Sequence, residues 1–180
     1  MSFTFEGFVQ DIRAAALQPD ASEAVRSTLQ RYVLNPEPII AATPQGGDDE
    51  IMLFEDDTLS IWWCRFEPHV IMPPHEHKLE VHIATYSGGE KNVIFKRDAG
   101  KLIHDSTHVV QAGEVFSLDK DGLHAVGGDG DQQSLSLHVY MGPLTTLKRD
   151  LFEWTTGEPV AFTMDNFIGM KRAVADLPPF

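Results

Sequence analysis

The sequence contains one cysteine and no long apolar segment. Cys64 is the only thiol among 180 residues, so a single chain cannot form an internal disulfide or a cysteine-based zinc cluster. Apolar runs such as residues 61–64 are far below the roughly 20 residues that a membrane-spanning helix needs. The first 16 residues lack a basic stretch followed by a long apolar block, so we expect no signal peptide and a cytoplasmic protein.

Basic residues are also few. Lysine and arginine total 14 against 27 acidic residues, which gives a net charge of −13. This balance predicts neither nucleic acid nor an anionic membrane as a partner. A length of 180 residues with 42% hydrophobic residues is typical of one globular domain with a sizeable core.

The N-terminal part of the chain has a helical pattern. Apolar residues recur at helical spacing over residues 5–33, and Pro19 divides this stretch into two predicted helices. Asp20 and Ser22 supply caps for the second helix. The sequence NPEPII at residues 35–40 predicts a break in the helix, and residues 43–50 are a loop by composition.

From about residue 51 the pattern changes to short strands. These runs are rich in β-branched and aromatic residues and are separated by turn residues every 8 to 12 positions, which is typical of an all-β sandwich or barrel. The predicted strands lie at 51–56, 59–67, 80–86, 92–97, 101–110, 114–118 and 134–141. Residues 127–133 are expected to form a hairpin loop. Phe152, Trp154 and Phe162 are expected to pack outside the barrel.

Three of the eight histidines fall within PPHEHKLEVH, residues 73–82. His75 and His77 are two positions apart, so in a strand both side chains point to one face and can share an ion. Neutral imidazole is a common ligand of transition metals. The alternative is a surface strand that carries polar residues by chance.

Two further histidines favour the metal site. His82 follows His77 in a predicted strand, and His124 begins another strand just after a turn. Two close histidines on one hairpin and a third from a distant strand are an arrangement in which a small barrel can bind a metal. His69, His104 and His108 are expected to be surface or structural residues.

At this point the sequence resembles the cupins. PPHEHKLEVH with SGGE resembles the first cupin block, and AGEVFSLDKDGLHAVGG at 112–128 resembles the second. The resemblance implies an all-β double-stranded β-helix, a jelly-roll barrel, here preceded by N-terminal helices. A cupin usually has a ligand glutamate where this chain has His82, so His82 is either a fourth ligand or a pocket residue.

A more specific resemblance lies in SLSLHVYM, residues 134–141. Ser136, His138 and Tyr140 alternate along one strand face and are similar to the relay of the cysteine dioxygenase family of thiol dioxygenases. The alternative is a half-buried strand with a polar outer face. The resemblance implies one Fe(II) per chain held by three histidines, with other divalent metals such as Zn, Ni or Mn able to load. It also implies that Tyr140 donates a hydrogen bond to the substrate or oxygen, that His138 accepts from Tyr140, and that Ser136 fixes the His138 tautomer.

Two departures from that family concern the substrate. His82 stands where some members carry a cysteine crosslinked to the relay tyrosine, and Cys64 lies elsewhere in the chain, so we expect no crosslink. Cysteine-specific members hold the substrate carboxylate with an upstream arginine, but residues 46–50 here are GGDDE. Arg65, or else Arg97, is the nearest candidate for that role.

We therefore predict a cupin metalloenzyme that oxidises a small thiol to its sulfinate with O2. Its regions are a helical lead at 1–48, the barrel at 49–145 and a C-terminal extension at 146–180, in one structural domain. A homodimer is expected only by analogy with other cupins. The alternatives are a cupin enzyme of another class, such as a carbon-substrate dioxygenase or an isomerase, and a non-catalytic binding barrel.

Overall fold

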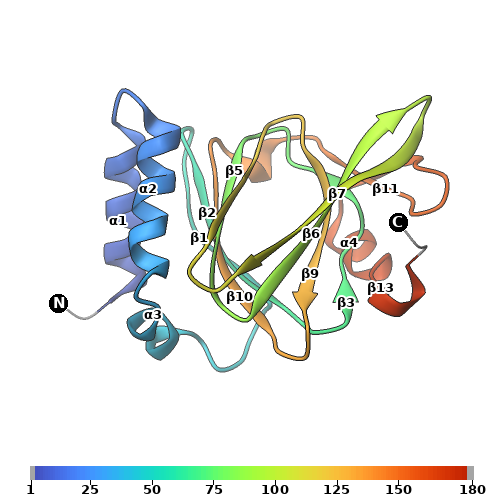
Figure 1. Cartoon of the computed structure of the whole chain (residues 1–180). Helices are drawn as coiled ribbons and strands as arrows, with labels where there is room; N and C mark the ends of the chain where they lie inside the picture. The colour runs from blue at the N-terminus through green and yellow to red at the C-terminus, as the bar shows by residue number, and fades with distance from the viewer. Residues whose placement is uncertain (1–2, 178–180) are drawn as a thin grey trace.

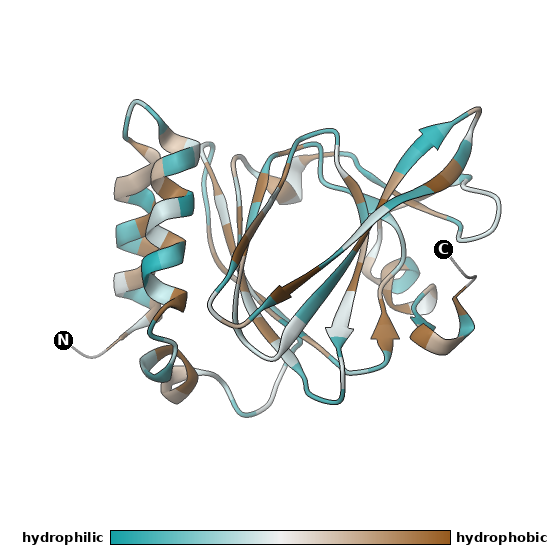
Figure 2. Cartoon of the chain, in the orientation of Figure 1, coloured by the Kyte–Doolittle hydropathy of each residue, from teal (hydrophilic) through white to brown (hydrophobic). Residues whose placement is uncertain are grey.

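A computed structural model describes residues 3–177 of the chain. Its N-terminal part is a helical layer made of α1 (Phe5–Ala16), α2 (Ala21–Val33) and α3 (Glu37–Ala42), stacked beside one face of the barrel (Figure 1). The Thr4 hydroxyl accepts a hydrogen bond from the Gly7 amide at 3.1 Å and caps α1. Hydrophobic and hydrophilic residues alternate along α1 and α2 (Figure 2), as expected for helices that bury one face.

Prolines do not prevent the third helix, contrary to the break predicted at residues 35–40. Pro36 is the N-cap of α3, and Pro38 lies in its first turn. Amide groups in the first turn of a helix have no partner within the helix, so a proline there removes no helical hydrogen bond.

The first sheet faces the helices. Its strands are antiparallel and run in the order β1-β2-β10-β5-β8. Their bounds are β1 Glu50–Glu55, β2 Ser60–Phe66, β5 Val81–Ser87, β8 Val115–Leu118 and β10 Ser134–Tyr140. Alternation along these strands divides their side chains between two faces. Ile61, Trp63, Leu137 and Val139 pack with the helices in one buried cluster, which leaves their neighbours in sequence facing the second sheet.

The second sheet closes the barrel. It runs in the order β12-β11-β4-β9-β3-β13, and β6 pairs with both β9 and β7. The bounds are β3 Val70–Ile71, β4 His75–Glu76, β6 Gly89–Asp98, β7 Lys101–Gln111, β9 Leu123–Asp129, β11 Asp150–Phe152, β12 Pro159–Ala161 and β13 Arg172–Ala173. The chain after β10 also forms α4 (Met164–Gly169) and the short 3-10 helices Leu144–Thr146 and Val174–Asp176.

The predicted all-β barrel with N-terminal helices is confirmed. The expected hairpin loop at 127–133 is shorter than predicted, because β9 continues to Asp129. Gly127 and Gly128 lie inside this strand because another chain segment passes close by; a Cβ atom on Gly127 would lie 2.2 Å from the Val70 carbonyl oxygen. Among the described helices, none is both long and apolar enough to cross a membrane.

Candidate metal centre

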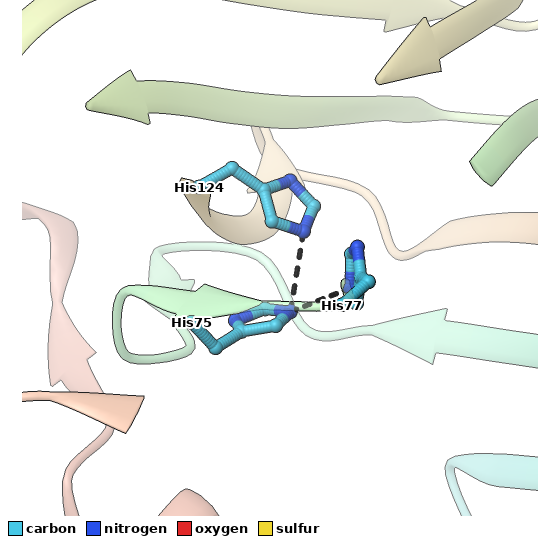
Figure 3. Close-up of side chains that lie close together, drawn as sticks. All are labelled: His75, His77 and His124. Atoms are coloured by element: carbon cyan, nitrogen blue, oxygen red, sulfur yellow. Dashed lines mark hydrogen bonds between the residues drawn. The ribbon is translucent and has the colours of Figure 1, made fainter. Parts of the chain in front are cut away.

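Three buried histidines meet between the two sheets. His75 lies on β4 directly opposite His124 on β9, and His77 is the first residue after β4. Their side chains converge in Figure 3. The exposed fractions of the three residues are 4%, 2% and 1%. Antiparallel pairing therefore brings together residues that are 49 positions apart in the sequence.

The spacing of these nitrogens suits a shared ion. The Nε2 atom of His75 lies 3.1 Å from Nε2 of His77 and 3.2 Å from Nε2 of His124, and the potential ligand atoms of the three residues all lie within 4.8 Å of one another. Two imidazole nitrogens bound to one ion at about 2.1 Å, at angles between square and tetrahedral, lie about 3.0 to 3.4 Å apart. The triad could therefore hold one metal ion.

Hydrogen bonds from Nδ1 fix the orientation of the His75 and His124 rings. Nδ1 of His75 donates to the carbonyl oxygen of Pro73 at 2.8 Å, and Nδ1 of His124 donates to Oδ1 of Asn92 at 2.7 Å. Both acceptors are oxygens, so the proton of each neutral ring lies on Nδ1 and the Nε2 lone pair faces the other histidines. Facing lone pairs repel each other unless a cation lies between them, which favours a metal at this position.

The environment keeps the triad uncharged. Burial lowers the pKa of His75 to about 3 and holds the pKa of His77 and His124 well below the ordinary histidine value, because desolvation disfavours the imidazolium ion. Nδ1 of His77 is buried without a hydrogen-bond partner among the described residues. Neutral imidazoles are the form that binds metals.

The three histidines line a small cavity of about 60 Å³. The Tyr140 ring packs edge-on against His77, with ring centroids 4.9 Å apart. Aromatic side chains form much of the remaining wall, and the lining also includes Trp62, Cys64, Phe66, Phe162 and Phe167. Phe162 therefore faces the site and is not outside the barrel as predicted. Cys64, although distant in sequence, lines the same cavity as Tyr140.

A hydrogen-bonded chain along β10 leads to this cavity. Ser136, His138 and Tyr140 share one strand face; the Ser136 hydroxyl lies 3.0 Å from Nε2 of His138, and Nδ1 of His138 lies 3.4 Å from the Tyr140 hydroxyl. Glu90 joins the chain from β6. Its carboxylate accepts from the Ser136 hydroxyl at 2.6 Å and lies 3.0 Å from Nε2 of His138.

These contacts influence the protonation of His138 and Tyr140. Burial alone would lower the pKa of His138, but the Cys64 sulfur and the Glu90 carboxylate beside the ring hold that pKa well above its usual range. Burial also raises the pKa of Tyr140 to about 12. Tyr140 therefore keeps its proton at neutral pH, and the Glu90 carboxylate beside the ring favours the charged form of His138.

Glu90 and Asn92 were not identified as site residues from the sequence: the strand predicted at 92–97 begins earlier, at Gly89, and so includes Glu90. Both are 0% exposed, and the Asn92 amide nitrogen donates to the Glu90 side chain at 3.2 Å. A carboxylate can only accept, so this bond presents Oδ1 of Asn92 to His124. The sequence feature that could have identified them is their spacing: Glu90 and Asn92 are two positions apart, so in a strand both side chains point to the same face.

Arg149 was also missed, and it lines the histidine cavity. Its guanidinium carbon lies 3.5 Å from the centre of the Phe162 ring. None of the salt bridges found within residues 3–177 involves Arg149. Burial lowers the pKa of Arg149, but arginine begins from so high a pKa that it stays charged at neutral pH. The cavity therefore has a cation available for an anionic ligand.

The structure places Arg65 elsewhere. Its Nε atom donates to the Asp49 carboxylate at 2.7 Å, and its NH2 group donates to the Gly47 carbonyl at 3.0 Å. Arg65 lines a neighbouring cavity and is absent from the lining of the histidine cavity. It cannot hold a carboxylate beside the triad from this position. Arg97 lies over the Phe152 ring at 4.9 Å and lines neither cavity.

His82 is neither a fourth ligand nor a pocket residue, contrary to both expectations. Its Nδ1 lies 2.8 Å from the Ser117 hydroxyl, and its Nε2 lies 3.3 Å from the hydroxyl of Ser22 on α2. The chain does bend before β5, with a positive φ of 59° at Lys78. After this bend Val81 and Ile83 face the barrel interior with Tyr140, so alternation turns His82 toward the helices.

Comparisons with solved structures bear on the fold. The DMSP lyase DddQ from Ruegeria pomeroyi DSS-3 aligns with a TM-score of 0.51 and 14% identity, over 79% of this chain and 93% of that chain. An RmlC-like cupin family protein with a double-stranded β-helix fold from Methanocaldococcus jannaschii aligns with a TM-score of 0.47 and 11% identity, over 58% and 90%. For Bacillus subtilis oxalate decarboxylase, studied for its Mn(II) centres, the TM-score is 0.45 and the identity 18%, over 59% of this chain and only 29% of that one.

No protein-family model matches the sequence, and no curated protein matches it either. The structural likenesses therefore concern the fold. The two antiparallel sheets, with the three histidines between them, form the all-β barrel that the sequence predicted, and the alignment with DddQ supports this fold. A fold of this kind hosts many different reactions.

Proposed function

We propose that this cupin is an Fe(II)-dependent thiol dioxygenase. In the proposed reaction R–SH and O2 give R–SO2H: two sulfur–oxygen bonds form, the O–O bond breaks, and sulfur loses the four electrons that O2 gains. The observation that carries the proposal is the hydrogen-bonded chain of Ser136, His138 and Tyr140, because it ends against the ring of the metal-site residue His77.

The ligand set fits this chemistry. Three neutral histidines leave a divalent ion with its full positive charge and with open coordination positions. An iron(II) ion bound by His75, His77 and His124 would supply the binding of thiolate and O2 and the electron transfer between them. One ion per chain is expected, because within residues 3–177 this is the group of metal-ligating side chains that the structure brings together.

Arg149 is proposed to orient the substrate. Within residues 3–177 its guanidinium forms no salt bridge, although the nearby Glu50 acts on it electrostatically, and it lies in the same cavity wall as the triad. A carboxylate group on the thiol would pair with it, and arginine suits this role because its planar donors match a carboxylate in a bidentate manner. The proposed substrate is therefore a thiol carboxylate, such as 3-mercaptopropionate or cysteine.

Tyr140 is proposed to donate a hydrogen bond to a reacting oxygen or sulfur atom. Its pKa of about 12 keeps the hydroxyl protonated. A charged His138 donates Nδ1–H toward the Tyr140 oxygen, which leaves the phenolic proton free to point into the cavity. The family resemblance implies the opposite direction, from Tyr140 to His138; the direction proposed here depends on a charged His138, which the Glu90 carboxylate 3.0 Å away would stabilise.

Aromatic walls are proposed to exclude water from the site. The rings of Phe162 and Phe167 stack on each other with centroids 5.1 Å apart, and they approach the His75 ring at 6.0 and 5.4 Å. An environment of this kind strengthens the electrostatic effect of Tyr140 and Arg149 on a bound substrate.

The test is thiol-dependent oxygen uptake by protein that has been loaded with iron under anaerobic conditions. Cysteine, cysteamine and 3-mercaptopropionate would be offered separately, with sulfinate quantified and with zinc-loaded protein as the control. We expect sulfinate to form in proportion to oxygen consumed with iron, and none with zinc. Stoichiometric iron without uptake on any thiol would refute the proposal and favour a cupin of another class or a binding barrel.

A further inference from the structure

A second cavity lies next to the histidine cavity and is much larger. Its volume is about 570 Å³, against about 60 Å³ for the cavity of the triad. Ligand sites for small molecules usually measure roughly 300 to 1,000 Å³. The histidine cavity is therefore too small to hold a whole ligand of ordinary size, whereas the second cavity falls within that range.

The two cavities share a wall. The side chains that line both come from β1, β2 and the segment of α4, and they are Glu50, Trp62, Phe66, Met164 and Phe167. A molecule that enters from the second cavity and reaches the triad would pass these residues. The larger cavity is therefore adjacent to the proposed reaction site, and only these shared side chains lie between the two.

The wall of the second cavity is largely apolar. Besides the shared side chains, Val70, Met72 and Ile168 line it. Met164 and Ile168 are each 50% exposed, so two apolar side chains of α4 stand partly in solvent at this cavity. Exposed apolar groups that line a cavity are typical of a ligand-binding surface.

The charged residues of this cavity limit what it can bind. Four carboxylates line it, on Asp48, Asp49, Glu50 and Glu67, against the two cations of Arg65 and Lys171. Arg65 is already paired with Asp49 at 2.7 Å. Excess negative charge disfavours an anionic group here, in contrast to the position beside Arg149.

We propose that the second cavity holds an apolar tail of the substrate, so that the preferred substrate is a thiol carboxylate with an extended apolar substituent. Its thiol and carboxylate reach the triad and Arg149, and its tail lies between Val70 and Ile168. This inference rests on the proposed dioxygenase activity for the identity of the reacting group, while the apolar site follows from the cavity itself.

The first experiment compares three thiols with the iron-loaded protein: 3-mercaptopropionate, its 2-benzyl derivative, and mercaptosuccinate, which carries a second carboxylate instead of a ring. Burial of the benzyl group should raise kcat/KM by about tenfold or more over 3-mercaptopropionate. Mercaptosuccinate should show no such gain. Turnover of 3-mercaptopropionate without a gain for the benzyl thiol would overturn the inference and leave the dioxygenase proposal intact.

The variant Ile168→Trp fills the second cavity without touching the first, since Ile168 lines only the larger one. It should remove the gain for the benzyl thiol, a loss of about tenfold, and leave turnover of 3-mercaptopropionate unchanged. Ile103→Trp is the matched control, because Ile103 is 48% exposed on β7 and lines neither cavity. Equal loss on both thiols in Ile168→Trp would contradict the inference.

A binding measurement separates the inference from the reaction. Calorimetry with 3-phenylpropanoate, which has a carboxylate and a ring but no thiol, should show binding to the wild type and to Ile103→Trp, and none to Ile168→Trp. If the iron-loaded protein oxidises no thiol, the dioxygenase proposal fails, and this pattern would still support the apolar site. Absence of binding to the wild type would overturn it.

Discussion

The carboxylate of Glu90 lies 3.0 Å from Nε2 of His138, and both residues are almost completely buried. Through its other oxygen and the Asn92 amide, Glu90 also sets the orientation of Asn92, which accepts from the metal-site residue His124. The Glu90 carboxylate therefore contacts both the hydrogen-bonded residues of β10 and Asn92, the residue that orients His124. A charge buried this deeply needs partners, and Glu90 has three of them, Ser136, His138 and Asn92.

Replacement of Glu90 by glutamine should keep the shape of this network and remove its charge. The pKa of His138 would then fall, because the carboxylate that raises it is gone. The charged form of His138 would be present only at lower pH, so the pH profile of kcat should shift toward acid, and kcat at neutral pH should fall about 10- to 100-fold. Steady-state kinetics over about pH 5 to 9 would measure this.

Iron content and the melting temperature distinguish this effect from a structural one. We expect Glu90→Gln to bind iron in wild-type amounts. A variant with lower kcat but an unshifted pH profile would show that Glu90 acts only on the packing.

Tyr140→Phe should separate metal binding from turnover. The substitution keeps the six-membered aromatic ring that packs on His77, so iron content should not change. Loss of the hydroxyl should lower kcat by about 10- to 100-fold if it donates to a reacting atom. Single-turnover sulfinate formation is the measurement, and unchanged turnover would exclude Tyr140 from the chemistry.

Local sequence patterns predicted much of this site. His75, His77 and the alternation of Ser136, His138 and Tyr140 were readable because a strand has a period of two. The partner of His75 across the sheet, His124, was predicted from its position after a turn. Glu90 and Arg149 were not, because their positions depend on β6 of the second sheet approaching β10 of the first, and on the segment after β10 reaching the histidine cavity.

His82 shows the limit of such patterns. The resemblance to cupins implied that His82 could reach the metal or its pocket, and the chain does bend at Lys78, shortly before this residue. Which residues face inward after a bend depends on the register with the neighbouring strands. Pairing of Val81 with Leu118 and Tyr140 fixes that register, and no local signal in the sequence specifies it.

Alanine variants can test whether the metal ligands are the three triad histidines and whether His82 is excluded from them. His75→Ala, His77→Ala and His124→Ala should each lose stoichiometric iron, because each removes one of the three nitrogens that converge. His82→Ala should retain iron but lower the free energy of unfolding by about 1 to 3 kcal/mol, since Ser22 and Ser117 would lose a buried partner. Metal analysis and denaturant titration provide the two readouts. Iron loss in His82→Ala with an intact fold would return His82 to the ligand set.

The metal-free protein should lose stability as pH falls. The folded-state pKa of the triad is depressed, to about 3 for His75, whereas an unfolded histidine has a pKa of about 6.5. Between these values the unfolded chain binds protons that the folded chain does not. The stabilising contribution is therefore present above about pH 6.5 and is lost as pH falls toward 3.

Melting temperatures across this pH range would measure the effect, with His75→Gln as the variant. Its melting temperature should depend less steeply on pH than that of the wild type. His108→Gln is the control, since His108 is exposed on β7, and it should keep the wild-type slope. Equal slopes in all three proteins would contradict the buried neutral state of the triad.

Arg149 offers the sharpest test of substrate orientation. Arg149→Gln should raise KM for 3-mercaptopropionate about ten- to hundredfold, because a charge-assisted pair with the carboxylate is lost. Cysteamine has a thiol but no carboxylate, so its kinetics should change little. Arg65→Gln is the matched control: Arg65 is paired with Asp49 and does not line the histidine cavity, so KM for 3-mercaptopropionate should stay near the wild-type value. If Arg65→Gln raised KM and Arg149→Gln did not, the carboxylate would have to bind from the side of the larger cavity, and the thiol would have to enter the histidine cavity in the opposite orientation.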